Sequence, residues 1–423
     1  MPSVNTISVR RHPISLGLGP NWQQFALLVA VNAFVGGMVG LERTVLPLLA
    51  EEEFGVTSKT AAVAFISTFG LAKALTNLFG GHFAGRYSRK DLLVIGWLFG
   101  LPVPFVIILA PDWYWIVAAN LLLGVNQGLT WSMTVNMKID LVGPRQRGLA
   151  LGLNEAAGYL AVAAAAYASG LIAEQYGMRP EPFYLGIVFA AVGLALSTLF
   201  VRDTHDFVAL EAAQHAVEPR QPLRTTFAEA TWRRPQLWGV SQAGFVNNLN
   251  DGLIWGIFPL FFASHGLGVE RIAVLASVYP LMWGTLQLVT GWLSDHTGRK
   301  PLIVGGMLLQ GAAIWMATAG ETFGLWFSSV ALVGVGTAMV YPTLMAAIGD
   351  AVHPQERSSA LGVYRFWRDA GAIAGALIGG SLADMLGFSA AIQIVAGLTL
   401  FSGALAAFAL PPKSPLRSEG VTP

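Results

Sequence analysis

Several long apolar segments of this sequence contain charged side chains, and these are the residues most able to do chemistry. The deepest of them are Lys73, Glu155, Asp251, Arg365, Arg368 and Asp369. A charge within a membrane span commonly costs about 2.5–3.5 kcal/mol on insertion scales, so such groups tend to face a bundle interior or water. Lys73, Arg365 or Arg368 suits binding of an anionic group. Glu155, Asp251 and Asp369 suit carriage of a proton, because burial favours a neutral carboxyl group and a passing cation favours the charged form.

The depth of three of these charges indicates a shared level. Lys73 lies eight residues before a basic loop, and Glu155 and Arg365 each lie eight residues after one. At about 1.5 Å per helical residue, all three are expected roughly 12 Å from that side of the membrane. In the alternative interpretation the charges pair with one another and only hold the bundle or gate one side. Glu42 and Arg43 lie toward the other end of their segment, where they could pair or reach water.

Uncharged polar and aromatic side chains surround the charges at positions that could face a cavity. They are Asn126, Gln127 and Trp131 in one segment, Asn247 and Asn250 beside Asp251 in another, and Trp283 and Tyr341 in two more. Amide groups in hydrocarbon need hydrogen-bond partners, which favours a binding role for the asparagines. An aromatic stripe in a membrane helix is more often packing than binding, and that alternative stays open for the aromatic residues.

The composition indicates which elements position these residues. Of 423 residues, 54% are hydrophobic and 12% are charged, whereas roughly a quarter are charged in an ordinary soluble chain. The chain has no cysteine, which excludes disulfides and thiolate metal sites. Apolar runs of about 20 residues can cross a bilayer as helices, so we expect an all-α membrane protein with twelve spans. The runs are 23–49, 61–82, 91–110, 114–136, 148–173, 183–201, 236–264, 271–292, 302–319, 323–347, 359–384 and 388–410.

A polar stretch with five Arg and five acidic residues divides the runs into two sets of six. We therefore expect an N-tail at 1–22, a six-helix bundle at 23–201, a linker at 202–235, a second bundle at 236–410 and a C-tail at 411–423. Seventeen Lys and Arg lie on the side of the tails and linker, and three lie on the other side. This asymmetry predicts that both termini are cytoplasmic.

Two loops carry related motifs at half the chain length. The segment GWLSDHTGRKP at 291–301 has a worn copy, GGHFAGRYSRKD, at 80–91, in which the Arg-Lys pair recurs 210 residues earlier. Asp140 and Asp350 follow the same spacing. A carboxylate in such a loop can cap a neighbouring helix, so these loops are expected to gate the protein. The expected gating residues are Arg86, Arg89, Asp295 and Arg299.

These motifs, the twelve spans and the repeat resemble the major facilitator superfamily over essentially the whole chain. The family's loop signature is close to G-x-L-x-D-R-x-G-R-[KR]. The later copy departs from it only at His296, and the earlier copy has Gly85 in place of Asp and Ser88 in place of Gly. The resemblance implies two pseudo-symmetric six-helix bundles that rock about a central solute cavity. The first, fourth, seventh and tenth spans would line that cavity, and parallel repeats place a solute site near the midplane between them.

The resemblance implies a secondary transporter of a small organic solute that works by alternating access and is coupled to protons. Within the spans, cations exceed acids by one, which favours an anionic or zwitterionic solute. A multidrug or metabolite efflux antiporter is the alternative. Drug antiporters of the superfamily often carry Arg where this chain has Gly124, and usually a Pro in the fifth span, which is absent here.

Other classes of protein find little support in the sequence. No GxSxG, HExxH or phosphate-binding glycine loop occurs, so we expect no enzyme, metal or cofactor. A membrane sensor that binds a solute without moving it would need an added signalling domain, and the tails and linker are short. The expected partners are a small solute, protons and the lipid bilayer, without nucleic acid. The protein is expected to act as a monomer in the cell (inner) membrane.

Overall fold

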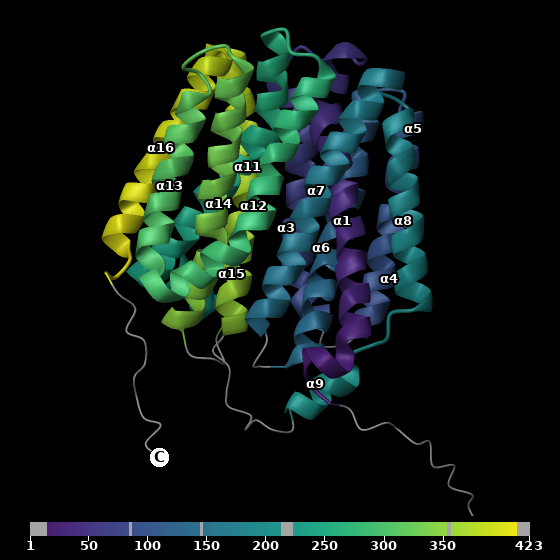
Figure 1. The fold of residues 1–423 in the computed structure, drawn as a ribbon, viewed down its shortest axis with the longest axis vertical. Helices are drawn as coiled ribbons and strands as arrows, with labels where there is room; N and C mark the ends of the chain where they lie inside the picture. The colour runs from purple at the N-terminus through teal and green to yellow at the C-terminus, as the bar shows by residue number, and fades with distance from the viewer. Residues whose placement is uncertain (1–14, 84–86, 144–146, 213–222, 353–356, 413–423) are drawn as a thin grey trace, which may run out of the picture.

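The chain folds into upright α-helices arranged as two bundles (Figure 1). The computed structural model describes residues 15–83, 87–143, 147–212, 223–352 and 357–412. In the N-terminal half the long helices are α1 (Leu18–Glu52), α3 (Ala64–Phe83), α4 (Arg89–Gly100) continued by α5 (Pro102–Leu109), α6 (Trp113–Val142), α7 (Arg147–Tyr176) and α8 (Glu181–Leu199). In the C-terminal half they are α11 (Pro235–Ser264), α12 (Val269–Thr297), α13 (Arg299–Met316), α14 (Phe323–Ala351), α15 (Arg357–Leu386) and α16 (Phe388–Ala409).

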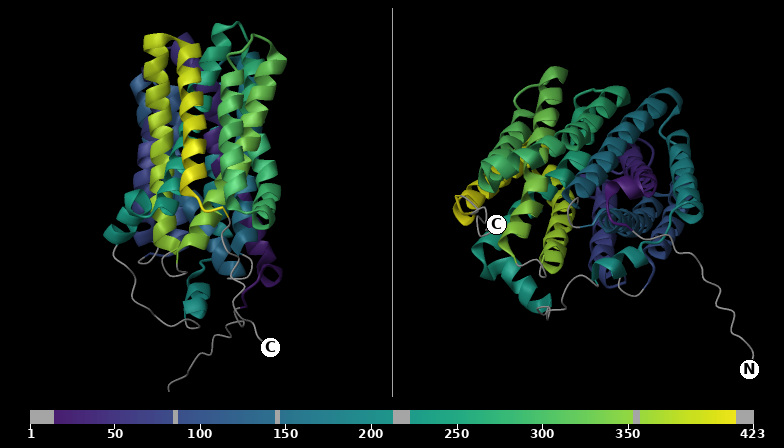
Figure 2. Two further views of the ribbon diagram at one scale, coloured as in Figure 1. Left: turned by 90° about the vertical axis from the view of Figure 1, so that its left-hand side faces the viewer. Right: turned by 60° about the horizontal axis from the view of Figure 1, so that its bottom comes forward.

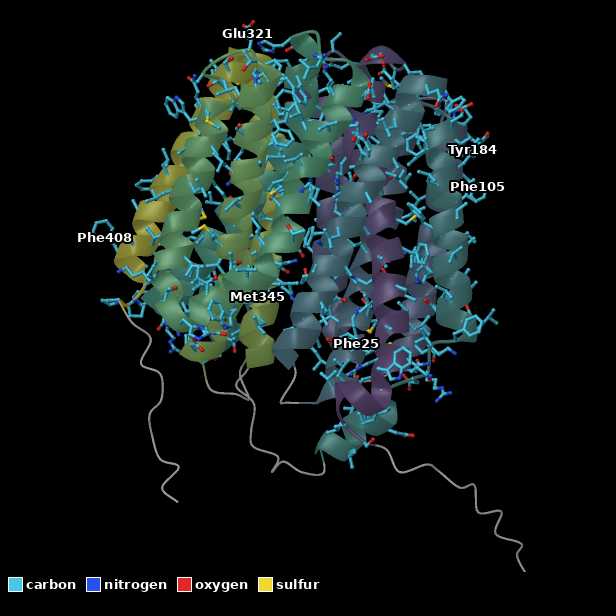
Figure 3. The ribbon with its side chains drawn as sticks, in the orientation of Figure 1. Phe25, Phe105, Tyr184, Glu321, Met345 and Phe408 are labelled. Atoms are coloured by element: carbon cyan, nitrogen blue, oxygen red, sulfur yellow. The ribbon has the colours of Figure 1, made fainter. Side chains whose placement is uncertain are left out.

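Within the described residues these helices make twelve spans, which confirms the predicted all-α membrane fold. Eight of the spans are long and apolar enough to cross a membrane by length and composition alone. Large apolar side chains cover the outer surface: Phe105, Tyr184 and Phe408 (Figure 3) are 44%, 52% and 90% exposed. In a bilayer this surface faces lipid, so its exposed apolar side chains carry no hydrophobic free-energy cost.

The connections are short where they join spans and longer between the halves. Helix ends follow local capping: the side chains of Ser88, Asp112 and Thr322 accept hydrogen bonds from the first turns of α4, α6 and α14, as expected for residues of this type. Between the halves lie α9 (His205–Ala212), α10 (Leu223–Ala228) and a π-helical turn, Glu229–Arg233. A further short helix, α2 (Lys59–Ala62), precedes α3.

The two halves stand side by side and meet along two pairs of helices, α3 with α15 and α7 with α12 (Figure 2). We call the end where α1 begins and α16 ends the terminal end, at the bottom of Figure 1, and the other the opposite end. Glycines permit close approach within each half. A Cβ at Gly36 of α1 would overlap the carbonyl of Gly158 in α7, and one at Gly371 of α15 would overlap that of Phe245 in α11. Small residues let membrane helices pack this closely.

The half-chain repeat is visible in ion pairs at the terminal end. Arg89 at the start of α4 pairs with Asp140 near the end of α6. Arg299 at the start of α13 pairs with Asp350 near the end of α14, with 2.9 Å between Nε and Oδ2. Both residues of the second pair lie 210 positions after those of the first, so the same contact is built twice. This equivalence supports the pseudo-symmetric relation between the halves.

Candidate functional site

A cavity lies between the two halves, and its walls come from both. The space free of atoms is about 440 Å³, including the part open to solvent. Helices α1, α3, α6 and α7 contribute from the N-terminal half, and α11 and α15 contribute from the C-terminal half. The polar lining residues are Arg43, Lys73, Gln127, Tyr159, Asn248, Asp251, Arg368 and Asp369. Of the predicted site residues, Lys73, Gln127, Asp251 and Asp369 therefore reach the cavity.

Asp369 is the centre of a charge cluster that joins the halves. Its Oδ1 lies 3.6 Å from Lys73 Nζ of α3 and 3.6 Å from Arg368 Nη1. Its Oδ2 accepts a hydrogen bond of 2.9 Å from Asn77 Nδ2, and Ser132 donates to the other end of the Asn77 amide. Asp369 is only 3% exposed. A buried carboxylate requires such partners, because an unpaired charge in a low-dielectric interior is costly.

Asp251 is the second cavity carboxylate. It lies on α11, is 2% exposed, and accepts a hydrogen bond from the hydroxyl of Tyr279 on α12. That hydroxyl is also 3.2 Å from Thr337 Oγ1 of α14. No ion pair of Asp251 is formed within the described part of the chain. Asp251 therefore has one strong donor, whereas Asp369 has two cations and an amide.

Glu155 lies beside the cavity, behind a layer of aromatic rings. Its Oε1 accepts hydrogen bonds from Trp131 Nε1 at 2.9 Å and from Asn154 Nδ2 at 3.1 Å. Its Oε2 accepts one from the hydroxyl of Tyr341, in the other half, at 3.1 Å. Trp131 and Tyr341 are equivalent positions of the repeat, 210 residues apart. The two halves therefore supply matching donors to a single carboxylate.

Arg368 lines the cavity and contacts the aromatic rings beside Glu155. Its Nη2 donates to the Tyr159 hydroxyl at 3.2 Å, and its guanidinium lies 4.5 Å from the ring of Tyr341 and 5.9 Å from that of Trp283. Tyr159 and Trp283 stack with their centroids 3.5 Å apart. These rings exclude water and hold the guanidinium in one position. Arg365, one turn earlier on α15, is half-buried and does not line the cavity.

The asparagines of α11 are placed differently from one another. Asn247 and Asn250 both bond to Gln310 of α13, at 2.9 Å each, and Thr399 of α16 also donates to Asn250. The amide groups of Asn247 and Asn250 therefore have hydrogen-bond partners within the C-terminal half. Asn248 lines the cavity instead. Residues 248, 251 and 255 share one face of a helix, because they are spaced by three and four.

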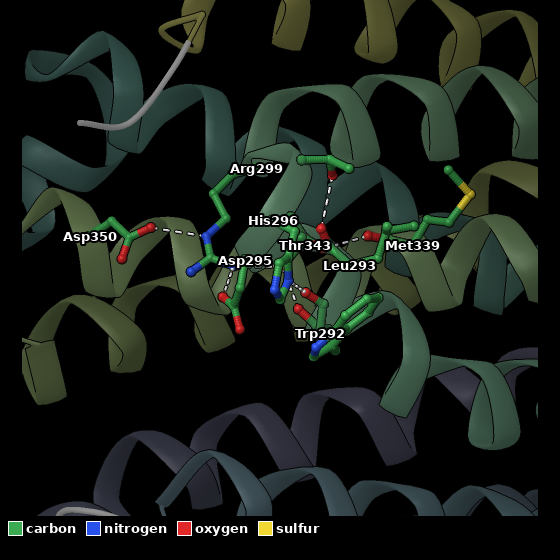
Figure 4. Close-up of polar contacts among 11 residues, drawn as sticks. Trp292, Leu293, Asp295, His296, Arg299, Met339, Thr343 and Asp350 are labelled. Carbon is green, nitrogen blue, oxygen red and sulfur yellow. Dashed lines mark hydrogen bonds and ion pairs between the residues drawn. The ribbon is translucent and has the colours of Figure 1, made fainter. Parts of the chain in front are cut away.

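The remaining predicted residues lie outside the cavity. Asn126 donates to the carbonyl of Gly96 on α4 at 2.8 Å. Arg299 contacts both Asp295 and Asp350 (Figure 4), and Arg89 contacts Asp140 as described above. These pairs form within one half. Arg86 lies outside the described residues.

The principal cavity residue that sequence reasoning left aside is Arg43. The sequence shows it as a charge next to Glu42, which suggests a local pair. In the structure Arg43 lines the cavity and Glu42 does not, and no ion pair joins the two side chains within the described residues. Neighbouring helical residues point about 100° apart at 3.6 residues per turn, so adjacency in sequence does not produce contact.

The fold and this two-sided site define a membrane transporter class, and the comparisons with known proteins identify it. The sequence model of the Major Facilitator Superfamily matches residues 25–248 and 240–422. The chain belongs to this superfamily and is a multi-pass membrane transporter.

Similar proteins span nearly its whole length. Multidrug resistance protein MdtG of Citrobacter koseri is 24% identical over 396 residues, 90% of this chain and 94% of the relative. The same protein of Enterobacter lignolyticus is 24% identical over 398 residues, covering 90% and 91%. Among solved structures, a bacterial homologue of the human lysosomal transporter Spinster, inward-facing and unoccupied, has a TM-score of 0.70 at 13% identity, covering 92% and 96%. A POT family transporter bound to a thioalcohol-conjugated peptide has a TM-score of 0.72 at 12% identity, covering 90% and 95%. These structures share the fold of this chain.

Proposed function

We propose that this protein is a proton-coupled secondary transporter that moves a small organic solute by alternating access through the cavity between its halves. The observation that carries the proposal is the charge cluster around Asp369. Lys73 comes from one half, and Arg368 and Asp369 come from the other. A solute group that displaces either partner changes the contact between the halves, so binding can be linked to their relative motion.

The proposal assigns the coupling proton to a cavity carboxyl group. Glu155, Asp251 and Asp369 are the candidates, and their surroundings differ. Asp369 keeps two cations close, and Glu155 accepts three hydrogen bonds. Asp251 has Tyr279 alone as its hydrogen-bond donor among the described residues. We therefore assign proton exchange to Asp251, which faces the cavity and has the fewest hydrogen-bond and ion-pair partners of the three among the described residues.

Multidrug efflux is the second candidate function. It is favoured by the relatives named multidrug resistance protein, which match over 90% of the chain. Both candidates use the same cavity and differ in the direction of the solute and in how many solutes are accepted. The charge asymmetry of the sequence supports placement of the terminal end, with both tails and the linker, in the cytoplasm. The cavity is built within one chain, which is consistent with action as a monomer.

Flux in proteoliposomes tests the proposal. Purified protein is reconstituted with and without an imposed pH gradient, and accumulation of organic anions, zwitterions and cations is followed. Accumulation that depends on the gradient, and that is lost in Lys73→Ala, is expected. Binding without flux under any gradient would instead favour a sensor and would reject the transporter.

A further inference from the structure

Arg43 is a buried cation with two hydrogen-bonding nitrogens, Nε and Nη1, that have no partner in the part of the chain that the structure describes. It lies on α1, is 1% exposed, and lines the cavity. Its guanidinium carbon lies 4.7 Å from the ring centroid of Trp255 on α11 and 5.1 Å from that of Phe69 on α3. The faces of these two aromatic rings favour the charge of the guanidinium. Both halves of the protein therefore hold this one group in place.

Two guanidinium nitrogens of Arg43 have no acceptor among the described residues. These are Nε and Nη1, both buried, and the buried indole Nε1 of Trp255 likewise has no hydrogen-bond partner there. Lys73 and Arg368, the other two cations of the cavity, both pair with Asp369. A buried charged donor left without an acceptor costs more than a neutral one. Such an unfilled set is therefore expected to have an acceptor supplied from outside the chain.

The carboxylates of Glu42 and Asp251 do not supply that acceptor. Both oxygens of Glu42 lack a hydrogen-bond partner among the described residues, so Glu42 does not bond to Arg43, and Asp251 accepts its hydrogen bond from Tyr279. Both charges act on Arg43 at a distance, but neither forms an ion pair with it within the described residues. Negative charge is therefore present near Arg43, but its directional N–H donors remain without an acceptor among the described residues.

We propose that Arg43, with the indole N–H of Trp255, is the subsite for the carboxylate or sulfonate of an organic anion whose apolar body lies along Phe69 and Val39. A planar guanidinium presents parallel N–H groups that match the two oxygens of such a group. The proposal rests on the proposed function, since it assigns the solute class of the same cavity. It makes Arg43 a residue that binds solute and leaves Asp369 to link the halves.

Binding of matched probes tests the subsite. The probes are 1-naphthoate, 1-naphthamide and 1-naphthylmethylammonium, which share one ring system and differ in charge. Dissociation constants are measured by calorimetry on the full chain in detergent, without any gradient. Naphthoate is expected to bind most tightly. Arg43→Gln is expected to weaken naphthoate about tenfold or more, as for loss of a hydrogen bond to a charged group, and to leave naphthamide unchanged.

Three further variants test whether the loss of binding is specific to the subsite. Arg43→Lys retains the charge without the planar donors and should give an intermediate loss. Trp255→Phe removes only the indole N–H and should give a smaller loss for naphthoate alone. Arg271→Gln is the matched control, because Arg271 also lies over a ring, 5.9 Å from Phe323, but outside the cavity. If Arg43→Gln does not fold, Trp255→Phe decides the outcome.

Two results would overturn the subsite. One is naphthoate binding no more tightly than naphthamide to the unaltered protein. The other is a loss in the Arg43 or Trp255 variants that is equal for all three probes or absent for naphthoate. Because binding is measured without a gradient, selective naphthoate binding with no flux in liposomes would refute the proposed transport and keep the subsite. Flux of neutral or cationic probes without naphthoate binding would refute the subsite and keep the proposed transport.

Discussion

Glu174 and Asp384 are equivalent residues, 210 positions apart, and each accepts backbone hydrogen bonds from a helix start in the other half. Asp384, near the end of α15, accepts from the N–H of Lys59 at 2.6 Å and of Thr60 at 3.0 Å, at the start of α2. Glu174, near the end of α7, accepts from the N–H of Glu270 at 3.3 Å, at the start of α12. The pseudo-symmetry thus builds the same cap twice, across the interface at the opposite end. A carboxylate is favoured at a helix N-terminus by the free N–H groups and the helix dipole.

Removal of these caps is expected to open the opposite end more often. Replacing an N-cap by Ala costs about 0.5–2 kcal/mol, so Asp384→Ala with Glu174→Ala should raise the population of the open state several-fold. The chain has no cysteine, so a single Val63→Cys reporter, fully buried in α2–α3, can be labelled without background. Faster labelling is expected in the double variant.

Asp112→Ala serves as the matched control for this experiment. Asp112 also caps a helix, by accepting from Tyr114 N of α6, but the helix belongs to its own half. Its loss should leave Val63→Cys labelling unchanged. Equal acceleration in both variants would mean that any lost cap loosens the fold, and the cross-half role would be refuted.

Asp369→Asn is expected to destabilise the protein strongly. It leaves Lys73 and Arg368 without their shared carboxylate, and breaking a buried pair in this way costs about 3–5 kcal/mol. Thermal unfolding in detergent should show a large fall in Tm. Adding Lys73→Met removes one of the stranded cations, so the double variant should unfold at a higher temperature than Asp369→Asn alone. Additive losses would contradict the pairing seen here.

Asp251→Asn is expected to separate solute movement from proton coupling. The amide cannot exchange a proton, so accumulation driven by a pH gradient should be lost while solute exchange down its own gradient continues. Glu42→Gln changes a carboxyl group that is equally buried but outside the cavity, and it should keep both activities. Gradient-driven accumulation by Asp251→Asn at the normal level would move the coupling proton to Glu155 or Asp369.

Asp295→Asn is expected to change the balance between the two facings of the carrier more than the stability of the protein. Its side chain is 60% exposed, whereas that of Asp350 on the other side of Arg299 is 35% exposed. Exposed ion pairs contribute about 0–1 kcal/mol, so Tm should fall more in Asp350→Asn than in Asp295→Asn. Accessibility labelling of Val63→Cys measures the facing. An unchanged labelling rate in Asp295→Asn would remove Asp295 from the gate.

The sequence by itself determined the spans, the repeat and the depth of the charges. Apolar length is a direct physical requirement of the bilayer, and a shared loop spacing places equivalent residues at equivalent depths. Lys73 and Arg365 were expected near one level from counting along their helices, and the structure joins Lys73 to Asp369, one turn beyond Arg365, at 3.6 Å. The cost of burying a charge also indicated that such groups would find partners.

Only the tertiary structure decided which way each helix is turned. A helix that is apolar around its whole circumference carries no periodic signal for its inward face, so Asn248 could not be distinguished from Asn247 and Asn250 on α11. The same rotation separates Arg43 from Glu42. The caps of Glu174 and Asp384 were hidden for another reason. The hydrogen-bond donors to these carboxylates are backbone N–H groups of the other half, and backbone groups leave no mark in the sequence.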